Sequence, residues 1–307
     1  MLLPDKVQTM GIAGLSIERA NGNLEVVDGR APEFYLETLG ISEEEKARLV
    51  ELVRNRIGHI DPAVSLLVSG TSGNAYAHLT GNDKLTEYPI PRIDLPPGEG
   101  RTLLDIGCNW GRWCMAATRA GYNVVGIDPS LGAAMAARRV ARELGYDIHY
   151  VVGDGRWLPF ARESFKVVHS YSVLQHFSKE DARRALSETS RVLTSDGLAR
   201  IQMANRIGLR SLQHQAKRGF REPIMFEVRY WPIGELRKAF ETAIGPTKVS
   251  VDCFFGLGWQ WVDMKYMQAR HKPILLASEA LRQLSRLLPP MAHAADSVFC
   301  TARKSIA

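Results

Sequence analysis

Three acidic residues each follow a short aliphatic run: Asp105 in LLDIGCNWG, Asp128 in NVVGIDPS and Asp154 in YVVGDGRW. The first run ends in a glycine-rich turn, and such a turn before a helix offers backbone N–H groups and a positive helix end to an anion. Carboxylates at the same edge would instead accept hydrogen bonds from hydroxyl or ammonium donors. Helix capping and turn formation are the other common uses of such acids. The pattern favours a ligand site at the ends of neighbouring strands.

The turn after Asp105 discriminates between two classes of ligand. A dinucleotide-binding turn has glycine at its first, third and sixth positions, which here are Gly107, Asn109 and Arg112. Two of the three depart from that pattern, and the Asp105 carboxylate would repel a pyrophosphate while attracting the ammonium of an amino acid. Asn109 is compatible with a tight turn, because asparagine enters left-handed backbone conformations more readily than most residues. The turn favours a methionine moiety over a nicotinamide dinucleotide.

These segments resemble the class I S-adenosylmethionine-dependent methyltransferases over about residues 100–205. The resemblance implies that Asp128 accepts hydrogen bonds from the two ribose hydroxyls, that Asp154 takes the adenine amino group, and that the residues after Asp154 frame the ring. Asn109 and Lys166 stand where the family often has glycine and aspartate, without removing a named ligand contact. The implied cofactor is S-adenosyl-L-methionine, and the implied binding residues are Asp105, Gly107, Cys108, Asn109, Trp110, Gly111, Asp128, Pro129, Asp154, Gly155 and Arg156.

His176, in the segment VLQHF, is the candidate for chemistry. A neutral imidazole there could take a proton from a hydroxyl nucleophile at neutral pH, and a structural role is an equal alternative. The segment is similar to a VLEH stretch in the ubiquinone and menaquinone biosynthesis methyltransferase group, where the glutamate can help to hold a metal. Because Gln175 replaces that glutamate, no metal site is expected.

Several further residues could line an acceptor pocket, although each of them singly is more often structural. Trp110 could wall the pocket or cover a sulfonium, which an aromatic face attracts, whereas Trp113 is expected in the core. Arg112 could hold the methionine carboxylate or be an exposed helix residue. Substrate selection is expected from two insertions, 206–231 and 258–292, of which the first has six Lys or Arg against two Glu. Further candidates are Tyr76, His78, Tyr88, His214 and Tyr230.

From Arg101 onward, short apolar runs alternate with amphipathic stretches, as in βαβ units. Capping signals begin helices at Ser130 and at Ser178, the latter with Asp181 as a capping box, and another helix is predicted between Ser42 and Gly58. The predicted fold is α/β: a Rossmann-like, seven-stranded, mostly parallel sheet with helices on both faces and, by the resemblance, an antiparallel last pair. Residues 1–98 are predicted to be an accessory region and 99–307 the methyltransferase domain. The predicted strands are 102–106, 123–127, 148–152, 166–171, 198–203, 247–254 and 296–302.

The composition narrows the function classes. The chain has 307 residues, a formal net charge of +6 and 45% hydrophobic residues, and no stretch approaches the roughly 20 apolar residues that a membrane span requires. The N-terminus lacks the features of a signal peptide, which predicts a cytoplasmic protein. No basic stripe or RNA-binding module is found, so a small-molecule, lipid or glycan acceptor is preferred to nucleic acid. Peripheral membrane contact, the oligomeric state and a non-catalytic cofactor-binding subunit stay open.

Overall fold

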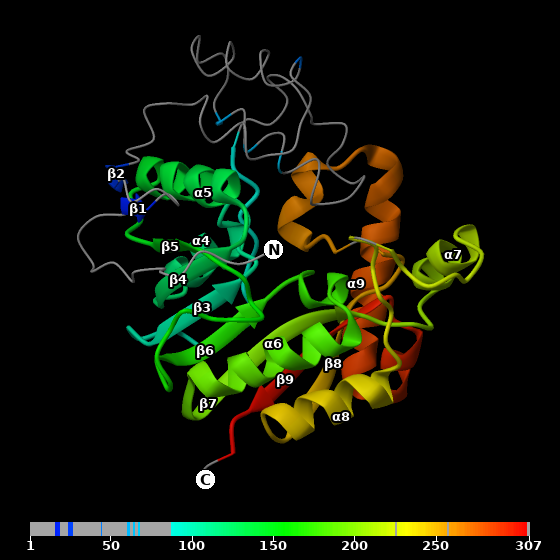
Figure 1. Ribbon diagram of the computed structural model, residues 1–307. Helices are drawn as coiled ribbons and strands as arrows, with labels where there is room; N and C mark the ends of the chain where they lie inside the picture. Colours follow the sequence, from blue (N-terminus) through cyan, green and yellow to red (C-terminus); the bar gives the residue numbers. More distant parts are fainter. Residues whose placement is uncertain are drawn as a thin grey trace.

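The computed structural model describes residues 87–305 except 225 and 257, together with 16–18, 24–26, 44, 60, 61, 64 and 67. A seven-stranded sheet in the order β5-β4-β3-β6-β7-β9-β8 forms its centre, and β1 and β2 form a separate antiparallel pair (Figure 1). The strands are β1 Ser16–Glu18, β2 Leu24–Val26, β3 Thr102–Ile106, β4 Asn123–Asp128, β5 His149–Val152, β6 Phe165–Ser170, β7 Leu193–Ala204, β8 Thr247–Cys253 and β9 Ser297–Arg303.

Strands β5, β4, β3, β6 and β7 are parallel, whereas β9 is antiparallel to both of its neighbours. The predicted fold class is therefore confirmed. The strand order reverses between β3 and β6, because the chain runs from β3 to β4 on one side and returns to β6 on the other. In open α/β sheets a crevice forms at this reversal, outside the carboxyl ends of the strands.

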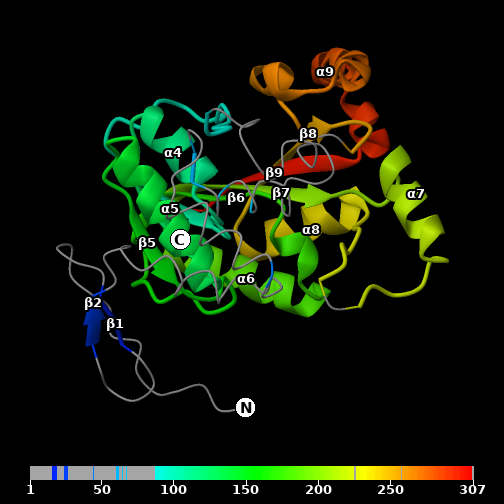
Figure 2. The same cartoon turned by 90° about the horizontal axis from the view of Figure 1, so that it is seen from above.

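Helices cover both faces of the sheet (Figure 2). Helices α4, α5 and α9 pack on one face, and α6 and α8 pack on the other. The α-helices are α4 Arg112–Arg119, α5 Leu131–Glu143, α6 Lys179–Val192, α7 Leu209–Lys217, α8 Ile233–Ala243 and α9 Lys272–Leu287. The 3-10 helices are η4 Leu174–His176, η5 Trp261–Tyr266, η6 Ala269–His271 and η7 Pro289–Ala294.

Side-chain caps fix where two of these helices begin. The Ser130 hydroxyl accepts a hydrogen bond from the Ala133 N–H, and the Ser178 hydroxyl accepts one from the Asp181 N–H. Each cap satisfies one of the N–H groups that a helix leaves unpaired at its start. Both predicted helix starts are confirmed, while the helix predicted from Ser42 lies outside the described residues.

Strand β7 differs from its prediction at one end. It begins at Leu193 rather than at residue 198, because Leu193 already pairs with Phe165 before an irregularity in the register. The long strand follows directly on α6, whose C-cap is also Leu193. The turn-forming residues Ser195, Asp196 and Gly197 lie inside the strand at this irregularity, where Asp196 has a left-handed φ of 61°, so the sequence predicts a strand only after them.

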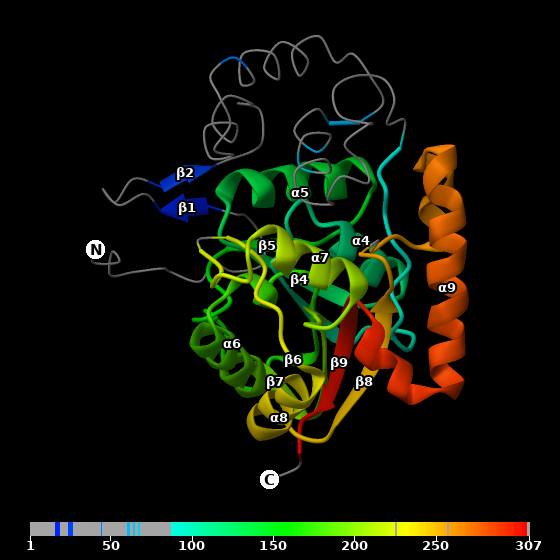
Figure 3. The ribbon, with the colours of Figure 1, turned by 90° about the vertical axis from the view of Figure 1, so that its right-hand side faces the viewer.

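The segment before β3 lies between α4 and α9 (Figure 3). The Tyr122 hydroxyl donates to the Pro96 carbonyl, and the backbone of Arg92 exchanges two hydrogen bonds with the Gln260 side chain. This part of the predicted accessory region therefore packs on the sheet. No helix among the described residues is long and apolar enough to cross a membrane.

Candidate functional site

A tight turn follows β3 and leads into α4. Gly107, Asn109 and Gly111 all have left-handed backbone angles, with φ of 73°, 49° and 82°. The N–H groups of Gly107 and Cys108 both donate to the Ile127 carbonyl, which ties the turn to β4. As expected, asparagine occupies one of these left-handed positions. Its side-chain oxygen accepts from the Trp110 N–H at 2.7 Å, which holds the turn from within.

The two glycines of the turn pack so closely against neighbouring side chains that neither position has room for a Cβ. A Cβ on Gly107 would lie 2.2 Å from a Val173 methyl carbon, and one on Gly111 would lie 2.4 Å from the Tyr150 hydroxyl. A third close approach is at Gly155 after β5, where a Cβ would lie 2.7 Å from Ile106. Backbone therefore packs against side chains at the carboxyl ends of β3 and β5, where the sequence predicted the ligand.

Asp128 lies at the end of β4, beside the turn. One carboxylate oxygen accepts from the Asn109 N–H at 2.8 Å and the other from the Ser130 N–H at 2.9 Å. Burial raises the pKa of Asp128, while these two N–H groups lower it and the charge of Asp105 raises it further. A carboxylate has about four acceptor positions, so these two bonds leave capacity for further donors.

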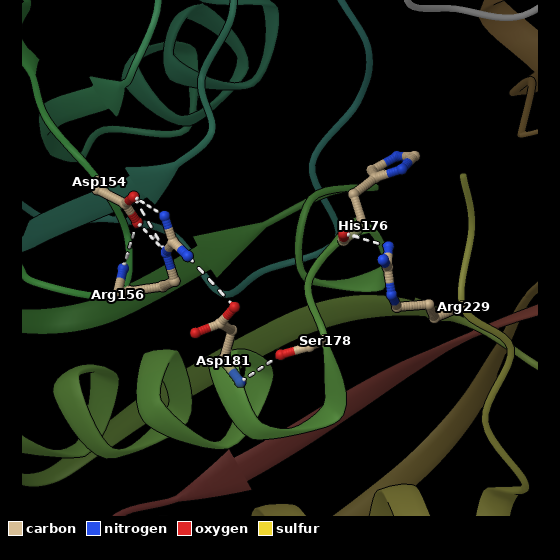
Figure 4. A network of polar contacts seen from close by, with 6 residues as sticks. All are labelled: Asp154, Arg156, His176, Ser178, Asp181 and Arg229. Carbon is tan, nitrogen blue, oxygen red and sulfur yellow. Dashed lines mark hydrogen bonds and ion pairs between the residues drawn. The ribbon is translucent and has the colours of Figure 1, made fainter. Parts of the chain in front are cut away.

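Asp154 follows β5 and forms a two-pronged ion pair with Arg156 (Figure 4). Burial by itself would raise the pKa of Asp154. The hydrogen bonds from the Arg156 side chain and backbone N–H outweigh burial and hold this pKa below its usual value. Arg156 also contacts Asp181 at 3.2 Å, so the predicted capping box is incomplete because that carboxylate binds an arginine. The guanidinium lies 4.7 Å from the centre of the exposed Trp157 ring.

Asp105 points into the protein instead of toward the turn. It is 1% exposed, and one oxygen accepts from His169 Nδ1 at 2.9 Å while the other accepts from the Cys114 thiol at 3.3 Å. The reason is its position inside β3, where it pairs with Gly126 and His169 on the neighbouring strands. The predicted contact of Asp105 with an ammonium group is not supported by this orientation.

Two further members of the predicted cofactor set are buried. Trp110 is 1% exposed and lies 6.1 Å from the Tyr88 ring, so its indole belongs to the core and not to an open pocket wall. Cys108 is also buried, and burial raises the pKa of its thiol to about 11. Trp113, expected in the core, is buried at the edge of a cavity and packs on His169 and Tyr171. Pro129 links Asp128 to the Ser130 cap.

His176 lies in η4, on the opposite side of Asp181 from Arg156 (Figure 4). Its Nδ1–H donates to the Phe226 carbonyl at 2.7 Å, and its ring stacks on the Phe226 ring at 4.1 Å. Burial lowers the pKa of His176, which keeps the imidazole neutral at neutral pH. Its carbonyl accepts from Arg229 at 2.6 Å. The imidazole also has a backbone hydrogen-bond partner at Ser172, and a catalytic role stays a prediction.

The remaining candidates fall into three groups. Tyr76 and His78 lie outside the described residues. Tyr88 donates to Glu143, and His214 contacts the Tyr230 hydroxyl at 3.2 Å. Among the residues that the structure describes, no cluster of His, Cys, Asp and Glu could hold a metal ion.

The sequence reasoning missed His169 and Tyr171. His169 forms a buried pair with Asp105, and Tyr171 donates to Asp252 at 3.2 Å. Both lie in the segment VVHSYS, where they were interpreted only as strand residues. The available signal was a histidine directly after the aliphatic pair Val167 and Val168 in a parallel strand, a position where continuous aliphatic residues are typical.

Comparisons with known proteins agree with this geometry. Residues 103–197 match the family model described as a methyltransferase domain. Ubiquinone biosynthesis O-methyltransferase from Brucella anthropi is 34% identical over 110 residues, which are 36% of this chain and 44% of that protein. The protein of the same name from Agrobacterium fabrum is 38% identical over 85 residues, or 28% of this chain and 34% of that one. The chain thus matches less than half the length of either relative.

A solved S-adenosylmethionine-dependent methyltransferase from Methanosarcina mazei superimposes on 70% of this chain and 100% of its own, at 18% identity and a TM-score of 0.48. The assignment depends instead on the sheet order, the left-handed glycine turn and the family match over residues 103–197. Residues 103–197 of the chain therefore carry a methyltransferase domain.

Proposed function

We propose that this protein transfers the methyl group of S-adenosylmethionine to a nucleophilic atom of a small molecule. The observation that carries the proposal is the pairing of Asp128 with the turn. One carboxylate oxygen binds the Asn109 N–H, so the acid is fixed beside the glycines at the edge of the sheet. Oxygen is the preferred acceptor atom, with nitrogen and carbon as alternatives, because the matched relatives are named O-methyltransferases.

The residues present fit this cofactor. Asp128 has acceptor capacity left for two hydroxyl donors, and its carboxylate is held beside the turn by the Asn109 N–H. Asp154 would take the adenine amino group with the oxygen capacity that Arg156 leaves. Gly155 and Arg156 would lie along the ring, and the backbone from Gly107 to Gly111 would hold the amino-acid end.

The cofactor, when bound, supplies a methyl group made electrophilic by a sulfonium. The protein then has to align the two reactants and exclude water, because reactants held in the correct geometry avoid the entropy cost of a bimolecular reaction. The turn is suited to this task because its conformation is fixed by the Asn109, Trp110 and Ile127 hydrogen bonds before any ligand arrives. A base is required only where the acceptor atom carries a proton.

We place the acceptor among small molecules, with lipid-linked and glycan-linked molecules as variants, and the protein in the cytoplasm. The location is supported by four cysteines that are all buried and unpaired. Thiols that stay reduced are typical of intracellular proteins.

Calorimetry with S-adenosylhomocysteine tests the cofactor assignment. Asp128→Ala should weaken binding by about ten- to a hundredfold, because a hydrogen bond to a charged group contributes about 1.5–3 kcal/mol. Asp147→Ala is the matched control: that aspartate is exposed and precedes β5 at the opposite edge of the sheet. Its affinity should equal that of the unmodified protein.

A second ligand separates a ribose contact from a change in the turn. The 2′,3′-dideoxy analogue of S-adenosylhomocysteine lacks the two hydroxyls, so Asp128→Ala should cost little further affinity toward it. An equal loss for both ligands would show that Asp128 acts only through the turn. Absence of any binding by the unmodified protein would reject the proposed function.

A further inference from the structure

A cavity of about 590 Å³ lies between the sheet and α9. Its walls come from β6, β7, β8 and β9, from α9, from the segment before β3 and from the loop at 258–262. Figure 3 shows α9 standing beside the sheet with the pre-β3 segment between them. The volume is in the range that binds a drug-sized molecule. Trp113, in the first turn of α4 and two residues after Gly111, is also part of the wall.

A buried histidine–aspartate pair faces this cavity. His169 lines the cavity and is 1% exposed, and its Nδ1 contacts the Asp105 carboxylate at 2.9 Å. Because a carboxylate can only accept, Nδ1 carries the hydrogen and Nε2 has a free lone pair. No hydrogen bond from the described residues engages Nε2. An acid that fixes one nitrogen of an imidazole leaves the other ready to accept a proton, as in hydrolase triads.

Aromatic rings line the cavity on the side of the imidazole, and one of them, Trp113, contacts it. The Trp113 ring lies 5.0 Å from His169 and 4.8 Å from Tyr171, and Tyr171 lies 5.9 Å from Phe299. Trp259, from the loop after β8, adds another ring to the lining. Such walls favour a flat, apolar ring, because aromatic pairs gain from stacked and tilted contacts beyond the area that they bury. The cavity therefore suits an aromatic molecule next to His169.

The charged residues of the cavity add a preference for an anion. Four arginines and three acids line it, and two of the arginines already have acidic partners: Arg200 binds Asp94 and Arg282 binds Glu279. The third acid, Asp252, is half-buried, and desolvation raises its pKa, which weakens its negative charge. The other two arginines, Arg92 and Arg286, are exposed at the rim and form no ion pair with the described acids. A carboxylate on the ligand could bind there.

We propose that this cavity is the acceptor pocket and that it takes a hydroxylated aromatic carboxylate, with His169 as the catalytic base and Asp105 as its positioning residue. This inference rests on the proposed methyl transfer. His169 Nε2 accepts the hydroxyl proton, the electron pair of the O–H bond stays on the oxygen, and the resulting imidazolium is stabilised by Asp105. The ring lies against Trp113 and Tyr171, and the carboxylate faces Arg286.

The probe for this pocket is 4-hydroxy-3-nitrobenzoate, whose phenolate absorbs visible light. Binding is followed by quenching of tryptophan fluorescence, since Trp113 and Trp259 line the cavity. We expect the pKa of the probe's phenol to fall on binding. In His169→Gln the probe should still bind while its phenol pKa returns toward that of the free compound. Asp105→Asn should give an intermediate shift, which a purely structural role would not produce.

A rim variant tests the anion preference without touching the core. 2-Nitrophenol lacks the carboxylate and should bind about tenfold more weakly than the probe, which corresponds to about 1.4 kcal/mol. Arg286→Gln should remove most of that difference. Arg142→Gln, on the exposed side of α5, is the matched control and should preserve it. This test stays available if the His169 variant does not fold, as judged by circular dichroism.

The outcomes separate this inference from the proposed function. S-adenosylhomocysteine and the probe should bind together, and competition between them would place the probe in the cofactor site and overturn the inference. An unchanged phenol shift in folded His169→Gln would also overturn it, as would the absence of quenching. If S-adenosylhomocysteine failed to bind while His169 still lowered the phenol pKa of the bound probe, the methyltransferase activity would be rejected. The assignment of the cavity as a binding pocket for the probe would stand.

Discussion

The cofactor edge and the α9 cavity are built in opposite ways. At the edge, the surface that we propose for the cofactor is mostly backbone, shaped by Gly107, Asn109 and Gly111 and fixed by hydrogen bonds to Asp128 and Ile127. In the cavity, the surface is made of side chains from segments between Arg92 and Phe299. The first site has a conformation that few sequences can adopt, whereas the second depends on which side chains meet.

Under the proposed function, this difference would let the domain keep one methyl donor while the acceptor that it binds changes. Glycine at left-handed positions cannot be replaced without strain, so the turn is constrained by geometry. The cavity contains paired and unpaired arginines, and a single rim residue such as Arg286 can change without moving the sheet. Asp105 connects the two regions, since it lies in β3 directly before the turn and holds His169 at the cavity.

The largest expected effect is at the turn. Gly107→Ala places a Cβ 2.2 Å from Val173 at a φ of 73°, which combines left-handed strain of roughly 1–2 kcal/mol with overpacking of roughly 1–3 kcal/mol. We expect the free energy of unfolding to fall by about 2–5 kcal/mol and binding of S-adenosylhomocysteine to disappear. Chemical denaturation and calorimetry measure the two effects.

Gly145→Ala is the control for that substitution. Gly145 has the same φ of 73°, but no atom lies within 4 Å of its added Cβ. It should therefore lose only the strain, about 1–2 kcal/mol, with the affinity for S-adenosylhomocysteine preserved. Equal losses of stability in both variants would show that the contact with Val173 contributes nothing, and the contrast between a constrained and an adaptable region would weaken.

The fold could be predicted because its signals are local. Each parallel strand is a short aliphatic run, and Ser130 and Ser178 mark helix starts with their own side chains. The start of β7 at Leu193 was missed, because the turn-forming residues Ser195, Asp196 and Gly197 lie inside the strand and not before it. The cofactor edge was located for the same local reason: glycines and acids follow directly on strands.

The orientation of individual side chains could not be predicted in the same way. Asp105 and His169 are 64 residues apart, and only the parallel pairing of β3 with β6 places them side by side. Once paired, a buried carboxylate binds its neighbour, because an unpartnered one would be costly. Trp110 is likewise buried, with its ring 6.1 Å from that of Tyr88, which is 22 residues earlier in the chain. Sequence patterns predict where the strands end, but they do not predict these long-range side-chain contacts.

The pH dependence of cofactor binding sharpens the comparison. Burial raises the pKa of Asp128, so its carboxylate protonates at a higher pH than an ordinary aspartate. The folded protein then binds this proton more readily than the unfolded chain does, and protonation of Asp128 stabilises the fold. Acidification should weaken S-adenosylhomocysteine binding while the protein stays folded. Calorimetry paired with circular dichroism across the acid range measures both.

Asp128→Asn provides the reference for that titration. The amide does not titrate, so its affinity should be lower at neutral pH and nearly constant as the pH falls. If the affinity of the variant followed the same acid profile as the unmodified protein, another group would be responsible. Asp154 could then be tested, although Arg156 holds its pKa below the usual value.

The smallest expected effect distinguishes the two histidines. His176 stacks on Phe226 outside the α9 cavity, and its Nδ1–H is bound to a carbonyl. His176→Ala should lose about 0.5–1.5 kcal/mol of stability with that ring contact, while bound 4-hydroxy-3-nitrobenzoate should keep its phenol shift. Only a base in contact with the phenol can lower the phenol pKa in this way. If the phenol shift were lost in His176→Ala and kept in His169→Gln, the base would be His176 in η4. The acceptor would then lie over the carboxyl edge of β6, and the two regions would form one site.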